Sequence, residues 1–252
     1  MRITFIGRIK LPRTWETVIS KESLWNYCYN LFMAQRKVAF VVDEYFHIYS
    51  RGVDKRKIFL DDRDRRRFVR LLYLCNNDKP IVYKLVKDKP LREIHIGERL
   101  VAIGAYCLMP NHFHLLIREV NDGGIVKFMR KLLTAYSSYF NKKYSRTGAL
   151  FSSEFKAQHL NTDEYLKYVF SYIHLNCLKL SDPDWKNQKL DKKKTLIFLN
   201  EYKFSSYCEY NESSGEREES IILTKEVFPK YFPKSEDFNK EIISWLRLDQ
   251  PL

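Results

Sequence analysis

Two histidines, His112 and His114, stand one residue apart in a stretch where polar and apolar side chains alternate. In a β-strand, successive side chains point to opposite faces, so both imidazoles would project from the same face. The other face would carry Phe113, Leu115 and Ile117, which are suited to a core. Two neighbouring imidazoles can bind one divalent cation. A His-x-His pair is also common by chance, and two histidines on a solvated strand face are the plain alternative.

A second polar group is expected on a helix that begins after Thr162. Thr162 can cap this helix, and Asp163 and Glu164 suit its first turn because acidic side chains interact favourably with the helix dipole there. Apolar residues recur at helical spacing and predict one buried stripe, formed by Leu166, Phe170, Ile173 and Cys177.

Tyr172 and Asn176 lie one helical turn apart on the flank of this stripe. His174 falls roughly 160° from Tyr172 on the helical wheel, at about 100° per residue. If Tyr172 faces the two strand histidines, Asn176 can therefore reach them and His174 cannot. An amide oxygen is a suitable ligand for Mg²⁺ or Mn²⁺ beside two imidazoles.

The elements that must position these residues follow the order strand, helix, strand, strand, helix, strand, helix. Alternation, helical periodicity and turn residues place them at 44–50, 61–75, 99–108, 112–117, 125–136, 149–160 and from 162 onward. The first six fit a ferredoxin-like or RRM-like βαββαβ domain of the α+β class, with an antiparallel sheet. Two helices would cover one sheet face, and the helix that carries Tyr172 would close over the other, open face.

The charge balance favours a polyanionic partner. Lys and Arg number 44 against 31 Asp and Glu, which gives a net charge of +13 and a pI near 9.4. Such a surplus is typical of proteins that bind nucleic acid or an anionic membrane. Aromatic residues make up 15% of the chain, and aromatic rings interleaved with basic charge are typical of single-stranded nucleic-acid binders. An aromatic-rich core in a basic protein is the alternative.

Two groups of residues are candidates for contacting DNA. Tyr45, His47 and Tyr49 alternate on one face of the first predicted strand, the open face, and Arg51 follows them. The polar side of the predicted helix at 125–136 carries further basic residues, namely Lys127, Arg130 and Lys131. A basic helix face is most often simply solvated, and either tyrosine of the first strand could instead pack under the last helix.

The five cysteines are odd in number, widely spaced and contain no Cys-x-x-Cys pair. This usage favours reduced thiols in the cytoplasm over a disulfide framework or a zinc knuckle. No apolar run reaches the length of a membrane span, and no signal-peptide pattern is present. We therefore expect a cytoplasmic protein that does not use a membrane.

Several of these motifs occur together, in this order, in one known family. The chain resembles the REP-associated tyrosine transposases, a branch of the single-tyrosine HUH (IS200-like) transposases. The matching segments are 45–52, 105–117, 129–141, 148–151, 172–176 and 204–207, so the resemblance covers roughly 41–207. Two departures stand out: Cys177 occupies a position where proline is usual, and Ser153 and Glu154 replace a commonly polar-basic pair.

The resemblance implies a metal-dependent endonuclease and strand transferase that acts on single-stranded DNA, usually near a hairpin, through a covalent 5′-phosphotyrosine. It implies that His112 and His114 are the histidine pair and that Asn176 is the third ligand of a divalent metal, Mg²⁺ or Mn²⁺. It also implies that Tyr172 is the nucleophile, in a monomer or a homodimer. The alternative is a non-catalytic or host-adapted nucleic-acid-binding protein on the same scaffold.

Three tyrosines on the last helix could be proposed as the nucleophile. Tyr168 lies farther round from the buried stripe and is expected to be exposed to solvent, and Tyr165 lies in the first turn, about three turns away from Asn176. Only Tyr172 has a possible metal ligand one turn further on.

By this interpretation the chain has three parts. Residues 1–40 form an N-terminal extension with helical spacing at 23–32, residues 41–182 form the HUH single-tyrosine catalytic domain, and residues 183–252 form a C-terminal extension. Within the domain, a polar insertion follows the first helix and is expected to contain a small hairpin at 81–86. The C-terminal extension is expected either to recognise DNA or to pack on the domain.

Overall fold

The computed structural model describes residues 38–246, apart from 153, 188, 212–216 and 232–233. The helix expected at 23–32, with Cys28, lies outside the described residues. The other four cysteines are buried free thiols, as expected for a reduced protein. In the described part of the chain, no helix has the length and apolar character needed to cross a membrane.

The sheet has four antiparallel strands in the order β2-β3-β1-β4. The strands are β1 (Tyr45–Arg51), β2 (Val101–Met109), β3 (His112–Glu119) and β4 (Lys156–His159). Helix α2 (Asp62–Leu74) lies between β1 and β2 in sequence, and α4 (Gly124–Lys143) lies between β3 and β4. This order and pairing are those of a ferredoxin-like βαββαβ domain, so the predicted α+β fold is confirmed.

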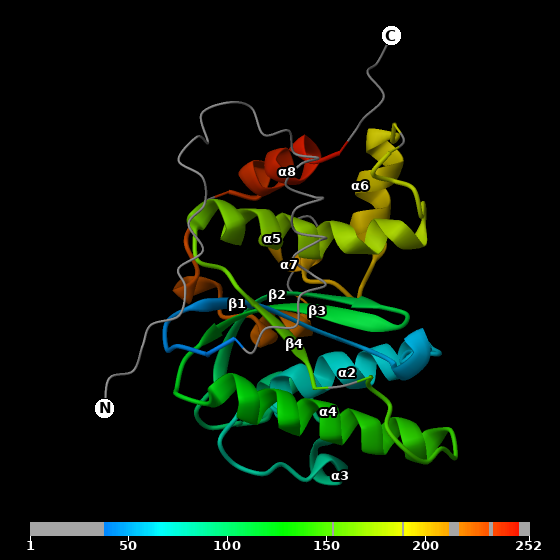
Figure 1. Cartoon of the computed structure of the whole chain (residues 1–252), viewed down its shortest axis with the longest axis vertical. Helices are drawn as coiled ribbons and strands as arrows, with labels where there is room; N and C mark the ends of the chain where they lie inside the picture. Colours follow the sequence, from blue (N-terminus) through cyan, green and yellow to red (C-terminus); the bar gives the residue numbers. More distant parts are fainter. Residues whose placement is uncertain (1–37, 153, 188, 212–216, 232–233, 247–252) are drawn as a thin grey trace. The chain divides into compact units, whose positions relative to one another are not determined.

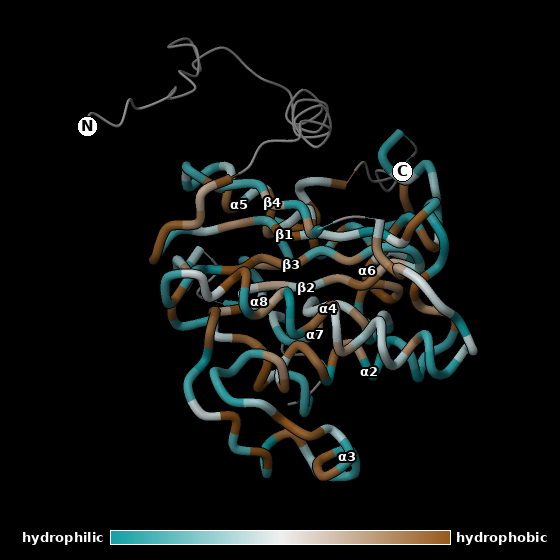
Figure 2. The backbone as a smooth tube through the Cα atoms, turned by 60° about the horizontal axis from the view of Figure 1, so that its bottom comes forward, coloured by the Kyte–Doolittle hydropathy of each residue, from teal (hydrophilic) through white to brown (hydrophobic). Residues whose placement is uncertain are grey.

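Helices α2 and α4 cover one face of the sheet (Figure 1). Residues Phe113, Leu115 and Ile117 of β3 point to that face and are fully buried, as their alternation predicts. The Phe68 ring of α2 lies 4.8 Å from the Phe113 ring. Figure 2 shows the hydrophobic stretches that run along the inner strands of the sheet. The sheet therefore has one closed, apolar face that fixes the register of its strands.

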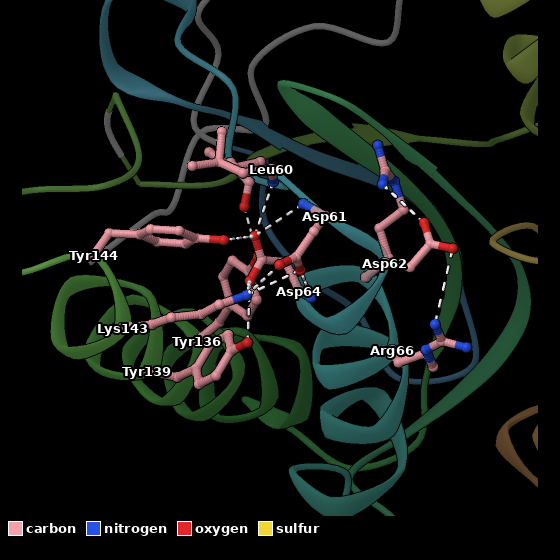
Figure 3. Close-up of polar contacts among 11 residues, drawn as sticks. Leu60, Asp61, Asp62, Asp64, Arg66, Tyr136, Tyr139, Lys143 and Tyr144 are labelled. Atoms are coloured by element: carbon pink, nitrogen blue, oxygen red, sulfur yellow. Dashed lines mark hydrogen bonds and ion pairs between the residues drawn. The ribbon is translucent and has the colours of Figure 1, made fainter.

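The buried carboxylate of Asp64 connects helices α2 and α4 through hydrogen bonds (Figure 3). Asp61 caps α2, and Asp64 completes the capping box. The Asp64 side chain is fully buried and accepts hydrogen bonds from the hydroxyls of Tyr139 and Tyr144 and from the Lys143 ammonium, at 3.0, 2.8 and 2.7 Å. The beginning of α2 is thereby fastened to the end of α4.

Helix α5 (Asp163–Leu175) covers the opposite face of the sheet (Figure 1). Thr162 caps it by accepting from the Tyr165 amide at 3.1 Å, as predicted. The four residues of the predicted stripe, Leu166, Phe170, Ile173 and Cys177, are all buried. A 3-10 helix, η3 (Asn176–Leu180), continues α5 without a break in sequence.

The C-terminal extension packs on this same side of the domain. Its helices are α6 (Lys192–Glu201), α7 (Tyr207–Tyr210) and α8 (Ser235–Ser244), joined by the 3-10 helices η5 (Glu218–Ile222) and η6 (Lys225–Val227). The segment before α7 pairs with the edge strand β2, since the Leu108 amide donates to Phe204 and the Ser206 amide donates to Tyr106, both at 2.9 Å. Covering the edge removes unpaired backbone groups that would otherwise be open to another strand.

Two local predictions are wrong. The hairpin expected at 81–86 is a short helix, α3 (Tyr83–Val86), next to the 3-10 helix η2 (Leu91–Glu93). Here Arg67 packs over the Tyr83 ring and Arg70 donates to the carbonyls of Val86 and Lys89. These contacts to α2 replace the strand pairing that a hairpin would need.

The strand expected at 149–160 is also shorter than predicted, because β4 spans only Lys156–His159. Before it, Phe151 forms a single bridge with Gly52. The residues between the bridge and the strand include Ser152 and Glu154, and glutamate in particular is depleted in strands.

Candidate active site

The open-face residues of β1 and β3 face one another in pairs. The antiparallel register places Arg51 opposite His112, Tyr49 opposite His114, and His47 opposite Leu116. The rings of His112 and His114 have centroids 4.9 Å apart and stand perpendicular to each other. The prediction that both imidazoles share one strand face is confirmed.

Each of the two histidines is oriented by a hydrogen bond through Nδ1. In His112, Nδ1 lies 2.6 Å from the Oδ1 of Asn111, an acceptor in the turn between β2 and β3, so Nδ1 carries the proton and the lone pair lies on Nε2. In His114, Nδ1 lies 2.9 Å from Nε2 of His47, and one of these two rings donates to the other. Such contacts fix the tautomer and the ring orientation of a metal-binding histidine.

Burial keeps the three imidazoles neutral. It lowers the pKa of His47 to about 3. It also lowers the pKa of His112 to about 3, with smaller contributions from the charges of Arg51 and Lys179. The pKa of His114 lies well below its ordinary value for the same main reason. Neutral imidazole is the form that ligates metals, so the protonation state suits the predicted role.

Tyr172 faces these histidines from α5. Its ring centroid lies 5.4 Å from that of His114 and 5.8 Å from that of His47, with nearly perpendicular planes. The Tyr172 side chain is half-buried. In this arrangement the tyrosine and the histidines belong to one chain.

The expectation that Tyr168 is exposed to solvent is wrong. Tyr168 is only 4% exposed because Trp245, just after α8, packs against it with ring centroids 5.1 Å apart. Tyr165 stacks on Tyr168 at 6.3 Å, and Tyr168 in turn stacks on Tyr172 at 6.1 Å. The helical wheel alone did not include the C-terminal extension, which covers this flank of α5.

Asn176 is the C-terminal cap of α5 and is buried. Its Oδ1 accepts a hydrogen bond from the Lys179 ammonium at 3.4 Å, and its Nδ2 has no hydrogen-bond acceptor among the described residues. The Lys179 charge acts on both His112 and His114, so Lys179 lies near enough to influence both imidazoles.

His174 does not join the cluster, as predicted. Its Nε2 lies 2.8 Å from the Ser206 hydroxyl, and its ring packs 5.3 Å from Phe238 of α8. This histidine therefore connects α5 to the C-terminal extension.

The residues present fit a divalent metal only in part. His112 and His114 are neutral neighbours with oriented rings, whereas the Asn176 oxygen, the predicted third ligand, is held by Lys179. In the part of the chain that the structure describes, no cluster of three or more His, Cys, Asp or Glu side chains could hold a metal. Binding through all three predicted ligands would place the metal close to the Lys179 ammonium, which lies 3.4 Å from the Asn176 oxygen.

The predicted DNA-contacting residues divide into two groups in the structure. Tyr49 packs against His47 and His114, and burial raises its pKa to about 12. The Tyr45 hydroxyl donates to the Val227 carbonyl at 3.1 Å, so Tyr45 contacts the C-terminal extension. Arg51 is exposed at the end of β1.

Lys127, Arg130 and Lys131 belong to α4, on the sheet face opposite α5 (Figure 1). The structure does not bring them to the histidines. Lys131 donates to the carbonyls of Asn77 and Lys79 at 2.6 and 2.9 Å, so it holds the loop after α2. A DNA contact by these three residues stays a prediction.

Two features of the site were missed from the sequence. His47 was assigned to DNA binding, but it is the direct hydrogen-bond partner of His114. Lys179 is not among the predicted site residues, although its position three residues after Asn176 on a helical segment is a usable signal.

Comparison with known proteins gives a family match and matches to solved structures. The model of the family described as "Transposase IS200 like" matches residues 70–176. The expected resemblance to the IS200-like transposases is confirmed. The matched segment contains His112, His114, Tyr172 and Asn176, but not β1 with His47.

A solved structure of a REP-associated tyrosine transposase bound to a REP hairpin is also similar, with a TM-score of 0.44 and 13% sequence identity. The similarity covers 74% of this chain and 90% of that chain. No curated protein matches this chain.

Proposed function

We propose that this protein is an endonuclease and strand transferase for single-stranded DNA, a transposase that uses Tyr172 as its nucleophile. The observation that carries the proposal is the position of Tyr172, whose ring faces His114 and His47 at 5.4 and 5.8 Å. The match of residues 70–176 to the IS200-like family supports it.

The proposed reaction is a reversible exchange at phosphorus. The Tyr172 hydroxyl oxygen attacks the phosphorus and loses its proton, the bond from phosphorus to the 3′ oxygen breaks, and the released strand ends in a 3′-OH. The strand on the other side stays attached to the enzyme as a 5′-phosphotyrosine. Attack by a second 3′-OH restores the diester and the tyrosine, so joining needs no ATP.

Tyr172 needs assistance because the ordinary pKa of a tyrosine is about 10. His112, His114 and Asn176 would hold a divalent metal, Mg²⁺ or Mn²⁺, which when bound would stabilise charge on the phosphodiester. The chain itself contributes the orientation of the rings, through Asn111 and His47, and a half-buried setting for the tyrosine.

We propose single-stranded DNA with a hairpin as the substrate, which the family resemblance suggests. The net charge of +13 supports a polyanionic partner.

The test is covalent capture of DNA by the full chain. A labelled hairpin oligonucleotide with single-stranded flanks, taken from the DNA that surrounds the gene, is incubated with the protein and Mn²⁺. We expect an adduct that survives SDS. Tyr172→Phe removes one oxygen and almost no volume, so it should abolish the adduct and retain DNA binding.

Tyr168→Phe is the matched control, because Tyr168 is buried against Trp245 and its neighbour Tyr172 is untouched. This variant should keep the adduct. An adduct formed by Tyr172→Phe would contradict the assignment of the nucleophile. DNA binding without any adduct from the wild type would favour the alternative, a non-catalytic nucleic-acid-binding protein.

A further inference from the structure

Two basic side chains from separate elements lie near the histidine pair. Arg51, at the end of β1, is the cross-strand neighbour of His112. Lys179, in η3, reaches the same place from the end of α5, and its charge acts on His112, on His114 and on Lys186 in the loop that follows.

In the part of the chain that the structure describes, neither Arg51 nor Lys179 has an acidic partner. Among the described residues, no carboxylate forms an ion pair with Arg51 or Lys179, whereas Lys167 of α5 pairs with Glu241 at 3.0 Å. Lys179 is partly buried, whereas Arg51 is exposed, and a partly buried cation beside a second cation is unfavourable unless an anion joins them.

The hydrogen bond that holds Lys179 is weak enough to be exchanged. The Lys179 ammonium lies 3.4 Å from the Asn176 oxygen, beyond the usual range for N–H···O bonds of about 2.7–3.2 Å. A phosphate oxygen would give a shorter, charge-assisted bond of about 2.7–2.9 Å.

We propose that Lys179, together with Arg51, binds the non-bridging oxygens of the phosphodiester that Tyr172 attacks. This inference rests on the function proposed above and adds a binding site for one particular phosphate. Tyr172 and Lys179 lie on one continuous helical segment, α5 followed by η3. The nucleophile and the phosphate ligand are therefore presented by the same helical segment, while Arg51 belongs to the sheet.

The ligand follows from the chemistry of the two cations. Arginine and lysine donate hydrogen bonds and accept none, so the site suits an anion whose oxygens face two directions. The phosphodiester gains negative charge on these oxygens during the exchange, and donors already in place stabilise that charge.

The test uses DNA in which one phosphate has lost its charge. The cleavage position is first mapped from the wild-type adduct. Binding is then measured for Tyr172→Phe, which cannot cleave, with and without Lys179→Met, on DNA that carries either a phosphodiester or a neutral methylphosphonate at that position. On the phosphodiester, Lys179→Met should weaken binding about tenfold, the size of a hydrogen bond to a charged group.

On the methylphosphonate the same substitution should have almost no effect, because the charge that Lys179 recognises is already gone. Lys84→Met is the matched control, since Lys84 is an exposed lysine on α3, at the far side of the domain from α5 (Figure 1). It should weaken binding slightly and equally on both DNAs. Lys179→Arg should retain the discrimination.

Three outcomes would be decisive. Equal losses on both DNAs would overturn the proposal, because they would mean that Lys179 acts only through general charge. Cleavage by Lys179→Met at the wild-type rate would also overturn it. If Lys179→Met does not fold, Lys179→Gln preserves a donor to Asn176 without the charge and should give the same selective loss. Absence of an adduct from the wild type would instead refute the proposed function itself.

Discussion

Replacing Asp64 with alanine should strongly destabilise the domain without altering its chemistry. The Asp64 carboxylate is fully buried between α2 and α4 and accepts from the Leu60 amide, two tyrosine hydroxyls and Lys143, at 2.7–3.0 Å (Figure 3). Burial opposes the charge of Lys143, but its hydrogen bonds to Asp61 and Asp64 outweigh this effect and raise its pKa.

The magnitude follows from the groups left behind. A hydrogen bond to a charged group contributes about 1.5–3 kcal/mol, and removing one partner of a buried ion pair costs about 3–5 kcal/mol. Lys143 keeps Asp61 as a partner at 2.8 Å, which limits the loss. We therefore expect a decrease of about 3–5 kcal/mol in the free energy of unfolding, or about 6–20 °C in Tm for a chain of this size.

Urea unfolding, monitored by circular dichroism, measures this decrease in the free energy of unfolding. The control is Asp62→Ala, which removes the exposed carboxylate that pairs with Arg65 at 3.2 Å and with Arg66 at 3.9 Å and should cost less than about 1 kcal/mol. Because α2 and α4 lie on the sheet face opposite α5 (Figure 1), Asp64→Ala should keep wild-type adduct formation at temperatures where it is folded. A loss below about 1 kcal/mol with cooperative unfolding would refute the reasoning.

Three further predictions concern the metal, the DNA and acid stability. His112→Ala should abolish the covalent adduct and leave the circular dichroism spectrum unchanged. EDTA should have the same two effects on the wild type, and full activity in EDTA would contradict a metal site. The affinity for single-stranded DNA should fall with salt, with a log–log slope of about −0.7 per phosphate neutralised, and a preference for duplex DNA would count against the proposed substrate. The hydrogen bond from Lys143 lowers the pKa of Asp61. The stability that this shift gives the folded protein is therefore complete above about pH 4 and is lost as pH falls through the folded-state pKa. Lys143→Met should lose less stability than the wild type between pH 5 and pH 3 in urea titrations, and equal losses would contradict this.

Alternation and helical periodicity predicted which side of each strand or helix is apolar, because this depends on the sequence of that element alone. The shared face of His112 and His114 follows from the two-residue period of β3, and the buried stripe of α5 follows from its own spacing. The βαββαβ order followed from recognising each element separately. These predictions needed no knowledge of what packs against each element.

The missed features all depend on contacts between distant segments. Tyr168 is buried because Trp245 packs on it, and α3 forms where a hairpin was expected because Arg70 holds its last carbonyl. The hydrogen bond between His47 and His114 joins residues that are 67 positions apart in sequence. Periodicity describes which side of an element is apolar but does not identify the partner.

The geometry of the site depends on residues beyond the family match. The match ends at residue 176, yet Lys179 contacts Asn176, Ser206 bonds to His174, and Phe238 packs on the other side of that histidine. The Ser206 amide in turn donates to the β2 backbone at Tyr106, three residues before the strand ends near the histidine turn. One short segment of the C-terminal extension thus joins the tyrosine helix to the sheet that carries the histidines. The angle at which Tyr172 meets His114 is therefore set by the whole chain from β1 to α8, and the extension is part of the active-site framework.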